Sequence, residues 1–160
     1  MEIKGMKFEY RKATIADLEL LIKTRIEVLR AANNLDDSID MSTVERESRL
    51  YYENALTNNL HTAYLVLDEN DFVGAGGISY YTVMPTFHNP TGRKAYVMNM
   101  YTRPDHRRMG IATRTLELLI HDAQKRGITS ISLEATDLGR KLYEKYGFIP
   151  MTSEMELPIK

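Results

Sequence analysis

The stretch from residue 95 to residue 133 restricts the fold more than any other part of the sequence. Residues 95–102 are rich in β-forming side chains, and Pro104 ends that strand because proline cannot donate to a ladder. From residue 108 to residue 126 the apolar positions recur with helical spacing, and residues 128–133 again have the pattern of a strand. A helix that joins two strands in this way forms a right-handed parallel crossover. The sequence therefore predicts a sheet that contains parallel strands.

Further strands and helices are expected on either side of this unit. Two β-rich segments flank the polar turn at residues 68–71, and a hairpin of this kind is antiparallel. The elements together predict a single domain of residues 1–160 in the α/β (α+β) class, with a mixed, twisted sheet of about six to seven strands flanked by about four helices. The expected strands are residues 7–11, 62–67, 72–81, 95–102, 128–133 and one or two more within 148–157; the expected helices are residues 14–32, capped by Thr14, residues 42–59, capped by Ser42, and residues 108–126 and 137–146, while residues 84–94 form a loop.

Composition excludes several kinds of site. The 160 residues contain no cysteine, so there is no disulfide, no thiolate nucleophile and no cysteine-ligated zinc, and the four histidines lack ligand-like spacing. We therefore expect no metal. A formal net charge of −1 provides no positive field for nucleic acid or an anionic membrane. The start lacks an apolar signal core and no apolar run is long enough to span a bilayer, so a cytoplasmic protein is expected.

The junction between the strand at residues 95–102 and the following helix is the most informative chemical feature. Residues 102–113 read Thr-Arg-Pro-Asp-His-Arg-Arg-Met-Gly-Ile-Ala-Thr. The unpaired amides and the dipole of a helix start suit a pyrophosphate, and Gly110 and Ala112 are small enough to let its oxygens reach the backbone. Arg107, Arg108 and Thr113 would add side-chain donors. The alternative is an ordinary helix start with solvated arginines.

Two motifs resemble those of the GNAT superfamily of N-acyltransferases. Arg107-x-x-Gly110-x-Ala112 is similar to the family's signature for the acyl-CoA pyrophosphate. The segment from Gly139 to Phe148 is similar to the family's helix in which Leu-Tyr is followed, after three residues, by Gly-Phe. The resemblance implies the GNAT fold over nearly the whole chain, with acetyl-CoA as co-substrate. It also implies splayed central parallel strands, between which the pantetheine arm of CoA inserts alongside residues 98–102 and 131–135.

The resemblance further implies roles for individual residues. Tyr143 corresponds to the general acid that protonates the departing thiolate, and a backbone N–H near Met100 to the donor that polarises the thioester carbonyl. Thr136 stands where many members have asparagine, and Arg108 where many have glycine. The expected CoA-binding residues are Met100, Tyr101, Thr102, Arg107, Arg108, Met109, Gly110, Ile111, Ala112, Thr113, Thr136 and Arg140.

The general base is less well defined. A carboxylate is the commonest device in this family, and Glu134, which follows the strand at residues 128–133, is the first candidate. An ordinary surface or salt-bridged carboxylate is the alternative for this residue. Glu27 on the first helix is a second candidate. Some members carry a glutamate toward the start of the strand at residues 95–102, where this chain has Tyr96.

The resemblance predicts an enzyme that transfers an acetyl group from acetyl-CoA to a primary amine on a small molecule, by direct attack. The contrasting class is a non-catalytic acyl-CoA-binding sensor or partner module. Six acidic residues against two arginines between positions 36 and 54 favour a cationic amine, unless they are only a solvated face. Tyr80, Tyr81, Met84, Phe87 and His88 either line the acceptor site or cover the edge of the core.

The expected partners are acetyl-CoA and a small amine, with neither nucleic acid nor a membrane. GNAT domains of this size commonly form homodimers, so a homodimer is one expected assembly. The alternative is that the apolar residues 148–159 complete the monomer's own sheet.

Overall fold

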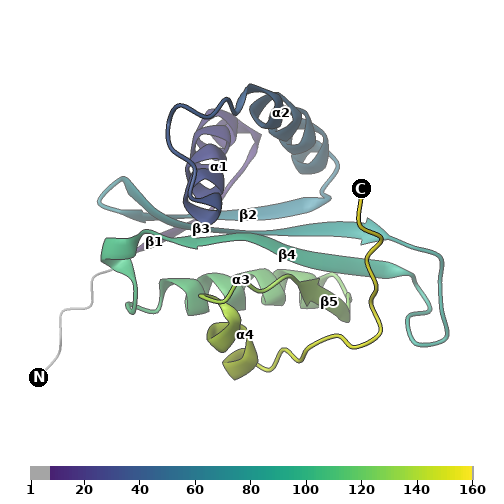
Figure 1. The fold of residues 1–160 in the computed structure, drawn as a ribbon. Helices are drawn as coiled ribbons and strands as arrows, with labels where there is room; N and C mark the ends of the chain where they lie inside the picture. Colours follow the sequence, from purple (N-terminus) through teal and green to yellow (C-terminus); the bar gives the residue numbers. More distant parts are fainter. Residues whose placement is uncertain (1–7, 160) are drawn as a thin grey trace, which may run out of the picture.

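A five-stranded mixed sheet separates two layers of helices in the computed structural model, which describes residues 8–159. Neighbouring strands from β1 to β4 pair antiparallel, whereas β4 and β5 pair parallel. Helices α1 and α2 cover one face, and α3 and α4 cover the other (Figure 1). The bounds in chain order are β1 (Glu9–Lys12), α1 (Leu18–Asn33), α2 (Ser42–Thr57), β2 (His61–Asp68), β3 (Asp71–Thr82), β4 (Arg93–Thr102), α3 (Ile111–Lys125), β5 (Ser130–Leu133) and α4 (Arg140–Tyr146).

This architecture confirms the predicted α/β class and the parallel connection from β4 through α3 to β5. Lys7, which was expected to open the first strand, lies outside the described residues, and β1 begins at Glu9. Within residues 8–159, no helix has both the length and the apolarity that crossing a bilayer requires. The strand count is lower than expected, because the last segment of the chain adds none to the sheet.

Residues 147–159 correct the prediction of one or two final strands. Their apolar side chains alternate with polar ones, as in a strand, yet Met155, Leu157 and Ile159 are 98%, 92% and 101% exposed. The segment leaves α4 and passes the sheet without joining it (Figure 1). A strand pattern is stabilised only where its apolar row is buried and its backbone is paired, and Pro150 lacks one of the required donors. The prediction was wrong because alternation does not reveal whether a partner strand is within reach.

Local hydrogen bonds and backbone angles set where the helices begin. The Thr14 N–H donates to the Asp17 carboxylate at 2.9 Å, in the short 3₁₀ turn that leads into α1. Ser42 does not cap α2 as expected: it is the first helical residue after the N-cap Met41, and its N–H donates to the Asp40 carboxylate at 2.9 Å. Helix α3 begins at Ile111, three residues later than predicted, because Arg108 and Gly110 have φ angles of 63° and 81°. Left-handed residues do not continue a right-handed helix.

Glycines in β3 allow α3 to pack closely against the sheet. A Cβ atom at Gly74 would lie 2.9 Å from Cγ2 of Ile111, and one at Gly76 would lie 2.5 Å from Cγ2 of Thr115. Both distances are well below ordinary van der Waals contact. The main core cluster on this face includes Leu116 and Leu119, which are completely buried. The distance between α3 and the sheet, and therefore the position of the N-terminus of α3, depends on glycine at positions 74 and 76.

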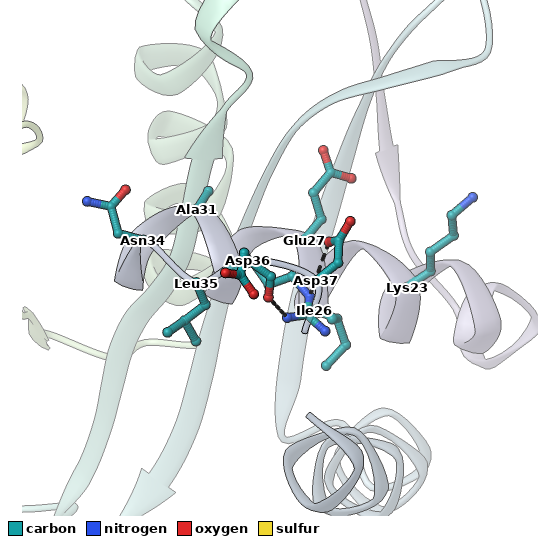
Figure 2. Close-up of a pocket in the computed structure, with 9 residues that line it drawn as sticks. Lys23, Ile26, Glu27, Ala31, Asn34, Leu35, Asp36 and Asp37 are labelled. Atoms are coloured by element: carbon teal, nitrogen blue, oxygen red, sulfur yellow. Dashed lines mark hydrogen bonds and ion pairs between the residues drawn. The ribbon is translucent and has the colours of Figure 1, made fainter. Parts of the chain in front are cut away.

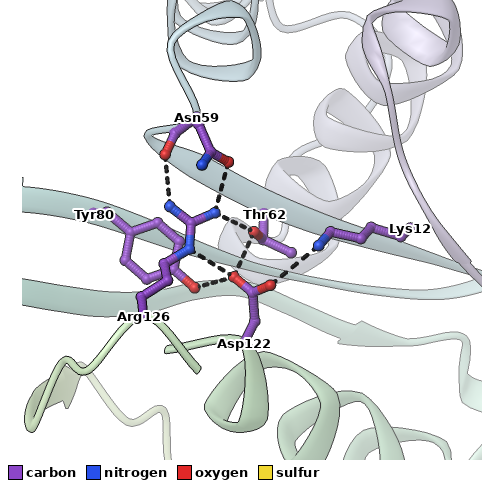
Figure 3. A network of polar contacts seen from close by, with 6 residues as sticks. All are labelled: Lys12, Asn59, Thr62, Tyr80, Asp122 and Arg126. Carbon is purple, nitrogen blue, oxygen red and sulfur yellow. Dashed lines mark hydrogen bonds and ion pairs between the residues drawn. The ribbon is translucent and has the colours of Figure 1, made fainter. Parts of the chain in front are cut away.

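A partly buried polar network joins α3 to the sheet (Figure 3). The Asp122 carboxylate accepts hydrogen bonds from Tyr80, from Thr62 at 2.8 Å and from Lys12 at 3.1 Å. It also pairs with Nε of Arg126 at 3.1 Å, and that guanidinium lies 3.8 Å from the centre of the Tyr80 ring. Burial alone would raise the pKa of Asp122, but the hydrogen bonds from these donors outweigh it and lower the pKa to about 2. The network therefore holds a charged carboxylate between α3 and three strands.

Asp122→Asn is expected to lower the free energy of unfolding at neutral pH by about 2 kcal/mol, because the amide cannot serve the same donors and leaves Arg126 without its carboxylate. A carboxyl whose pKa is lowered on folding stabilises the protein above its ordinary pKa of 3.8, and this contribution disappears as the pH falls toward 2. Urea unfolding of both proteins should therefore show a difference that shrinks with acidification. Glu117→Gln, which removes an exposed pair with Arg114 on the same helix, is the control and should change stability by less than about 0.5 kcal/mol. Equal effects of the two substitutions would contradict a structural role for Asp122.

Candidate active site

The two parallel strands separate halfway along β4. The β4–β5 ladder runs from the pair Lys94–Ser130 to the pair Val97–Leu133 and ends there, although β4 continues to Thr102. In the described chain, the edge of β4 that faces β5 is therefore unpaired from residue 98 onward. The splay that the resemblance implied is confirmed along residues 98–102, whereas residues 131–133, which were expected to border the gap, still pair with residues 95–97.

A bulge in β4 lies at the point of separation. Met98 pairs with Gly77 and Tyr101 with Ala75, so Asn99 and Met100 together face one residue of β3. Asn99 has a φ of 57°, which asparagine tolerates better than most residues. The extra residue turns the backbone at the place where the neighbouring strand departs.

The last residues of β4 lead from this gap toward α3. Met100 packs with the core cluster that contains Tyr143, while Tyr101 stacks on Phe72 with ring centres 6.1 Å apart. The Thr102 hydroxyl is buried and has no partner in the part of the chain that is described. These three residues, which were predicted to bind the cofactor, are thus adjacent to the opened edge.

The end of the loop before α3 and the first turn of that helix present a row of free amides. The backbone N–H groups of residues 108–113 donate no hydrogen bond to any described residue. A Cβ atom at Gly110 would have nothing within 4 Å, so the space above this residue is open. The side chains of Arg107, Arg108, Met109 and Thr113 are exposed here, whereas Ile111 is buried and Ala112 is half-buried. With the helix dipole, this arrangement suits a group carrying two or more negative charges.

A histidine fixes the start of this loop. His106 contacts Asp68 through Nε2 at 3.0 Å and Asp105 through Nδ1 at 2.7 Å, and Arg103 contacts Asp105 at 2.8 Å. The hydrogen bonds to Asp105 and then Asp68 raise the pKa of His106, while those from Arg103 and His106 hold the pKa of Asp105 well below its usual range. The loop is therefore tied to the turn between β2 and β3.

Tyr143 is buried on the inward side of α4, in the core cluster that also contains Val97 and against which Met100 packs. Burial raises its pKa, so the phenol stays protonated at neutral pH, and its hydroxyl has no hydrogen bond to any of residues 8–159. Thr136 is engaged locally, since its hydroxyl accepts the Gly139 N–H at 3.3 Å before α4 begins. Arg140 is exposed at the first turn of the helix. The predicted helix at residues 137–146 thus begins three residues later, after a turn.

The two candidate bases lie on the face of the sheet that α1 and α2 cover. Ile131, Leu133 and Ala135 pack toward α3, so the alternation along the strand directs Glu134 to the opposite face. Burial and then the Glu134 charge raise the pKa of Tyr96. Burial and then the Glu27 charge likewise raise the pKa of Tyr101. Glu134 is exposed and forms no ion pair with another described residue.

A pocket of about 250 Å³ opens on this face directly at the bulge. Its walls bring together side chains from five elements: Arg25 of α1, Tyr51 of α2, His61 of β2, Ser79 of β3 and Asn99 of β4. Sequence reasoning missed this pocket, because no spacing within one element marks it. The one available signal was an asparagine between two methionines of the strand, a residue type that is rare in strands and favours positive φ.

Hydrogen bonds order the pocket wall. The Tyr51 hydroxyl lies 2.8 Å from Nδ1 of His61 and 2.5 Å from the Ser79 hydroxyl. Burial, followed by the charges of Arg25 and Arg126, lowers the pKa of His61 to about 4. The imidazole is therefore neutral at physiological pH and orients the two hydroxyls without adding charge.

A second, larger hollow of about 620 Å³ runs along α1 and the loop after it (Figure 2). Glu27, Asp36 and Asp37 project over it, and Arg30 contacts the backbone oxygen of Asp36 at 2.5 Å. The Asp36 carboxylate accepts the Ser38 N–H at 2.8 Å and so shapes the turn. Part of the acidic run noted in the sequence thus has a local structural role.

The aromatic and apolar residues expected near the acceptor site do not line the pocket at the bulge. Tyr80 is buried on the α3 face against Arg126, and Met84 and Phe87 are 85% and 92% exposed in the loop after β3. Among residues 8–159, no group of three or more potential ligands is placed to hold a metal ion.

Comparison with known proteins identifies similar chains. Residues 29–148 match the acetyltransferase (GNAT) family. A crystal structure of a predicted acetyltransferase with acetyl-CoA from Clostridium acetobutylicum has a TM-score of 0.86 and 37% identity, covering 95% of this chain and 96% of that chain. A GCN5-related N-acetyltransferase from Ralstonia eutropha JMP134 has a TM-score of 0.81 and 26% identity over 96% of this chain and 99% of its own. An uncharacterized N-acetyltransferase of Bacillus subtilis, YsnE, is 38% identical over 61 residues, which span 35% of this chain and 40% of that protein.

Proposed function

The chain belongs to the acetyltransferase (GNAT) family, and on this premise we propose that it transfers an acetyl group from acetyl-CoA to the primary amine of a small molecule by direct attack. The observation that carries the proposal is the unpaired edge of β4, followed, after the hydrogen-bonded turn at residues 103–107, by the free amides of residues 108–113. One end of this path suits an extended amide-bearing chain, and the other suits a pyrophosphate.

Acetyl-CoA is the co-substrate, and its proposed position follows from these donors. The pyrophosphate accepts from the amides of residues 108–113, with Arg107 and Arg108 as flexible counter-charges. The pantetheine arm runs along residues 100–102 in the place of the missing strand, with its amides paired to the backbone of Thr102. Thr136, in the turn before α4, and Arg140, in the first turn of α4, are the proposed contacts on the other side of the gap.

The thioester carbonyl then lies at the bulge, where the backbone N–H of Met100 is its proposed donor. The amine nitrogen attacks the carbonyl carbon, a C–N bond forms, and negative charge collects on the oxygen. A donor held by the backbone needs no reorganisation as this charge develops, which is where such a group is most effective. Collapse of the intermediate breaks the C–S bond and releases the CoA thiolate.

Two proton transfers complete the proposed reaction. Tyr143 gives its phenolic proton to the departing sulfur and is reprotonated from solvent. Burial keeps this phenol protonated until the thiolate appears. Glu134, through a water molecule, takes the proton that the attacking amine loses; Glu27 is the second candidate for this role.

Release of CoA in the presence of amines tests the proposal. The chain has no cysteine, so a thiol reagent reports the released CoA without background from the protein. We expect CoA and N-acetylated product to appear in equal amounts with at least one small primary amine. An acetylated protein that forms and decays at the rate of turnover would refute direct attack. Tight binding of acetyl-CoA with no product from any amine would favour the non-catalytic sensor.

A further inference from the structure

We infer that the acceptor is a compact amino acid whose carboxylate is bound by Arg25, an inference that rests on the proposed acetyl transfer. Met98 and Asn99 line the pocket at the β4 bulge and do not line the larger hollow along α1. The pocket at the bulge therefore adjoins the proposed position of the thioester. A volume of about 250 Å³ suits a small molecule or one end of a larger one.

The arginine and the glutamate that line this pocket do not pair with each other. Arg25 is half-buried, and its one hydrogen bond to a described residue runs from Nη1 to Oδ1 of Asn99, at 2.9 Å. None of the ion pairs formed among residues 8–159 involves Arg25. The Glu47 carboxylate also lines the pocket, but its contact is with Arg46 at 4.0 Å. A guanidinium in this state has free donors and lacks a counter-ion.

A carboxylate is the group that matches these free donors. Its two oxygens fit the planar fork of a guanidinium, and such paired contacts are stronger than those between neutral groups. Apart from the Glu47 carboxylate, the polar groups beside Arg25 are neutral, because the Tyr51 and Ser79 hydroxyls are ordered by an uncharged His61. Arg25 therefore has neutral hydroxyl groups near it and no carboxylate of the described residues bound to it, a combination suited to an anionic group.

The position of Arg25 also sets the distance between carboxylate and amine. Asn99 forms the bulge and holds the Arg25 guanidinium, so the anion site and the proposed thioester site share one residue. A ligand that reaches both has its amine only a few bonds from its carboxylate. This geometry favours an amino acid over a polyamine or an aminoglycoside.

The acidic residues after α1 do not oppose this assignment. Asp36 and Asp40 hold the N–H groups of Ser38 and Ser42, and neither lines the pocket at the bulge. A cationic acceptor, which the acidic run suggested, would lie beside Arg25 in this pocket, and among the described residues Glu47 is the one carboxylate of the wall that could attract it.

The first test compares each natural L-amino acid with its own carboxamide, which keeps the amine and removes the negative charge. We expect at least one amino acid to be acetylated with a KM about tenfold or more below that of its amide. Amides or polyamines that react as well as the acids would overturn the inference while leaving acetyl transfer intact. Calorimetry on the CoA-loaded protein separates the two proposals further. Binding of an amino acid without turnover would refute only the reaction, and no binding of any amino acid would refute the role of Arg25.

The second test is Arg25→Gln, which should raise KM for the preferred amino acid about tenfold or more and leave KM for acetyl-CoA unchanged. Arg25→Lys keeps the charge without the fork and should give an intermediate KM. Lys23→Gln, on the same helix but outside this pocket, is the matched control and should behave as the wild type. Thermal unfolding of each variant checks the fold. A well-folded Arg25→Gln protein with an unchanged KM for the acid would overturn the assignment.

Discussion

Gly110→Asp is expected to abolish binding of CoA while the protein remains folded. The residue lies at the centre of the free amides before α3, and a side chain there projects into open space, so the substitution meets no atom of the protein. It does place a carboxylate where the pyrophosphate is proposed to bind, and repulsion then acts together with steric exclusion. Calorimetric titration with CoA measures the loss, and thermal unfolding verifies the fold.

Two matched variants separate the causes of this loss. Asparagine at position 110 would adopt the same positive φ as aspartate and has a similar size, but it has no charge. Gly110→Asn should therefore weaken binding less than Gly110→Asp does. Gly127→Asp adds the same charge at another glycine of positive φ with open space, at the opposite end of α3, and should leave CoA binding unchanged. Wild-type affinity in Gly110→Asp would mean that the cofactor binds elsewhere.

Tyr143→Phe is expected to lower kcat by about 10²- to 10⁴-fold, the usual contribution of a positioned general acid. The hydroxyl is bonded to no described residue, so its removal leaves no orphaned partner and should not disturb the core around the ring. Affinity for CoA should therefore stay close to that of the wild type. Steady-state kinetics combined with calorimetry distinguishes this split from a general loss of structure.

Tyr146→Phe provides the control for the same helix. Tyr146 is 41% exposed and lies one turn beyond Tyr143, so loss of its hydroxyl should affect neither kcat nor CoA binding. An unchanged kcat in Tyr143→Phe would remove this residue from the mechanism and leave the thiolate to be protonated by solvent.

The parts of the fold that could be predicted from sequence are those determined by neighbours along the chain. Pro104 and the helical spacing after it located β4, α3 and β5 because each signal acts within a few residues. The start of α3 was predicted too early because Arg108 and Gly110 adopt positive φ. No sequence pattern predicts a positive φ at an arginine. Residues 147–159 were misassigned because their alternation is strand-like, while pairing depends on distant backbone.

The residues of the candidate site likewise fall into those that local sequence motifs predict and those that only the folded chain brings together. Residues 107–113 and Tyr143 belong to short continuous motifs, so the resemblance carried them. The pocket at the bulge combines Arg25, His61 and Ser79 from three separate elements, and only the folded sheet brings them within hydrogen-bond or van der Waals reach of one cavity. Asn99 alone carried a local signal for that region.

The close seat of α3 on β3 affects how sequence variation at this protein should be interpreted. Gly74 and Gly76 lie on the sheet side of α3, and a methyl group at either position would displace the helix that carries the amide row. Selection on cofactor binding would therefore preserve these glycines although their missing side chains face Ile111 and Thr115 and not a ligand. If both positions proved invariant among relatives, the cause would be the short distance between α3 and the sheet. The invariance would not be evidence that these glycines contact the substrate.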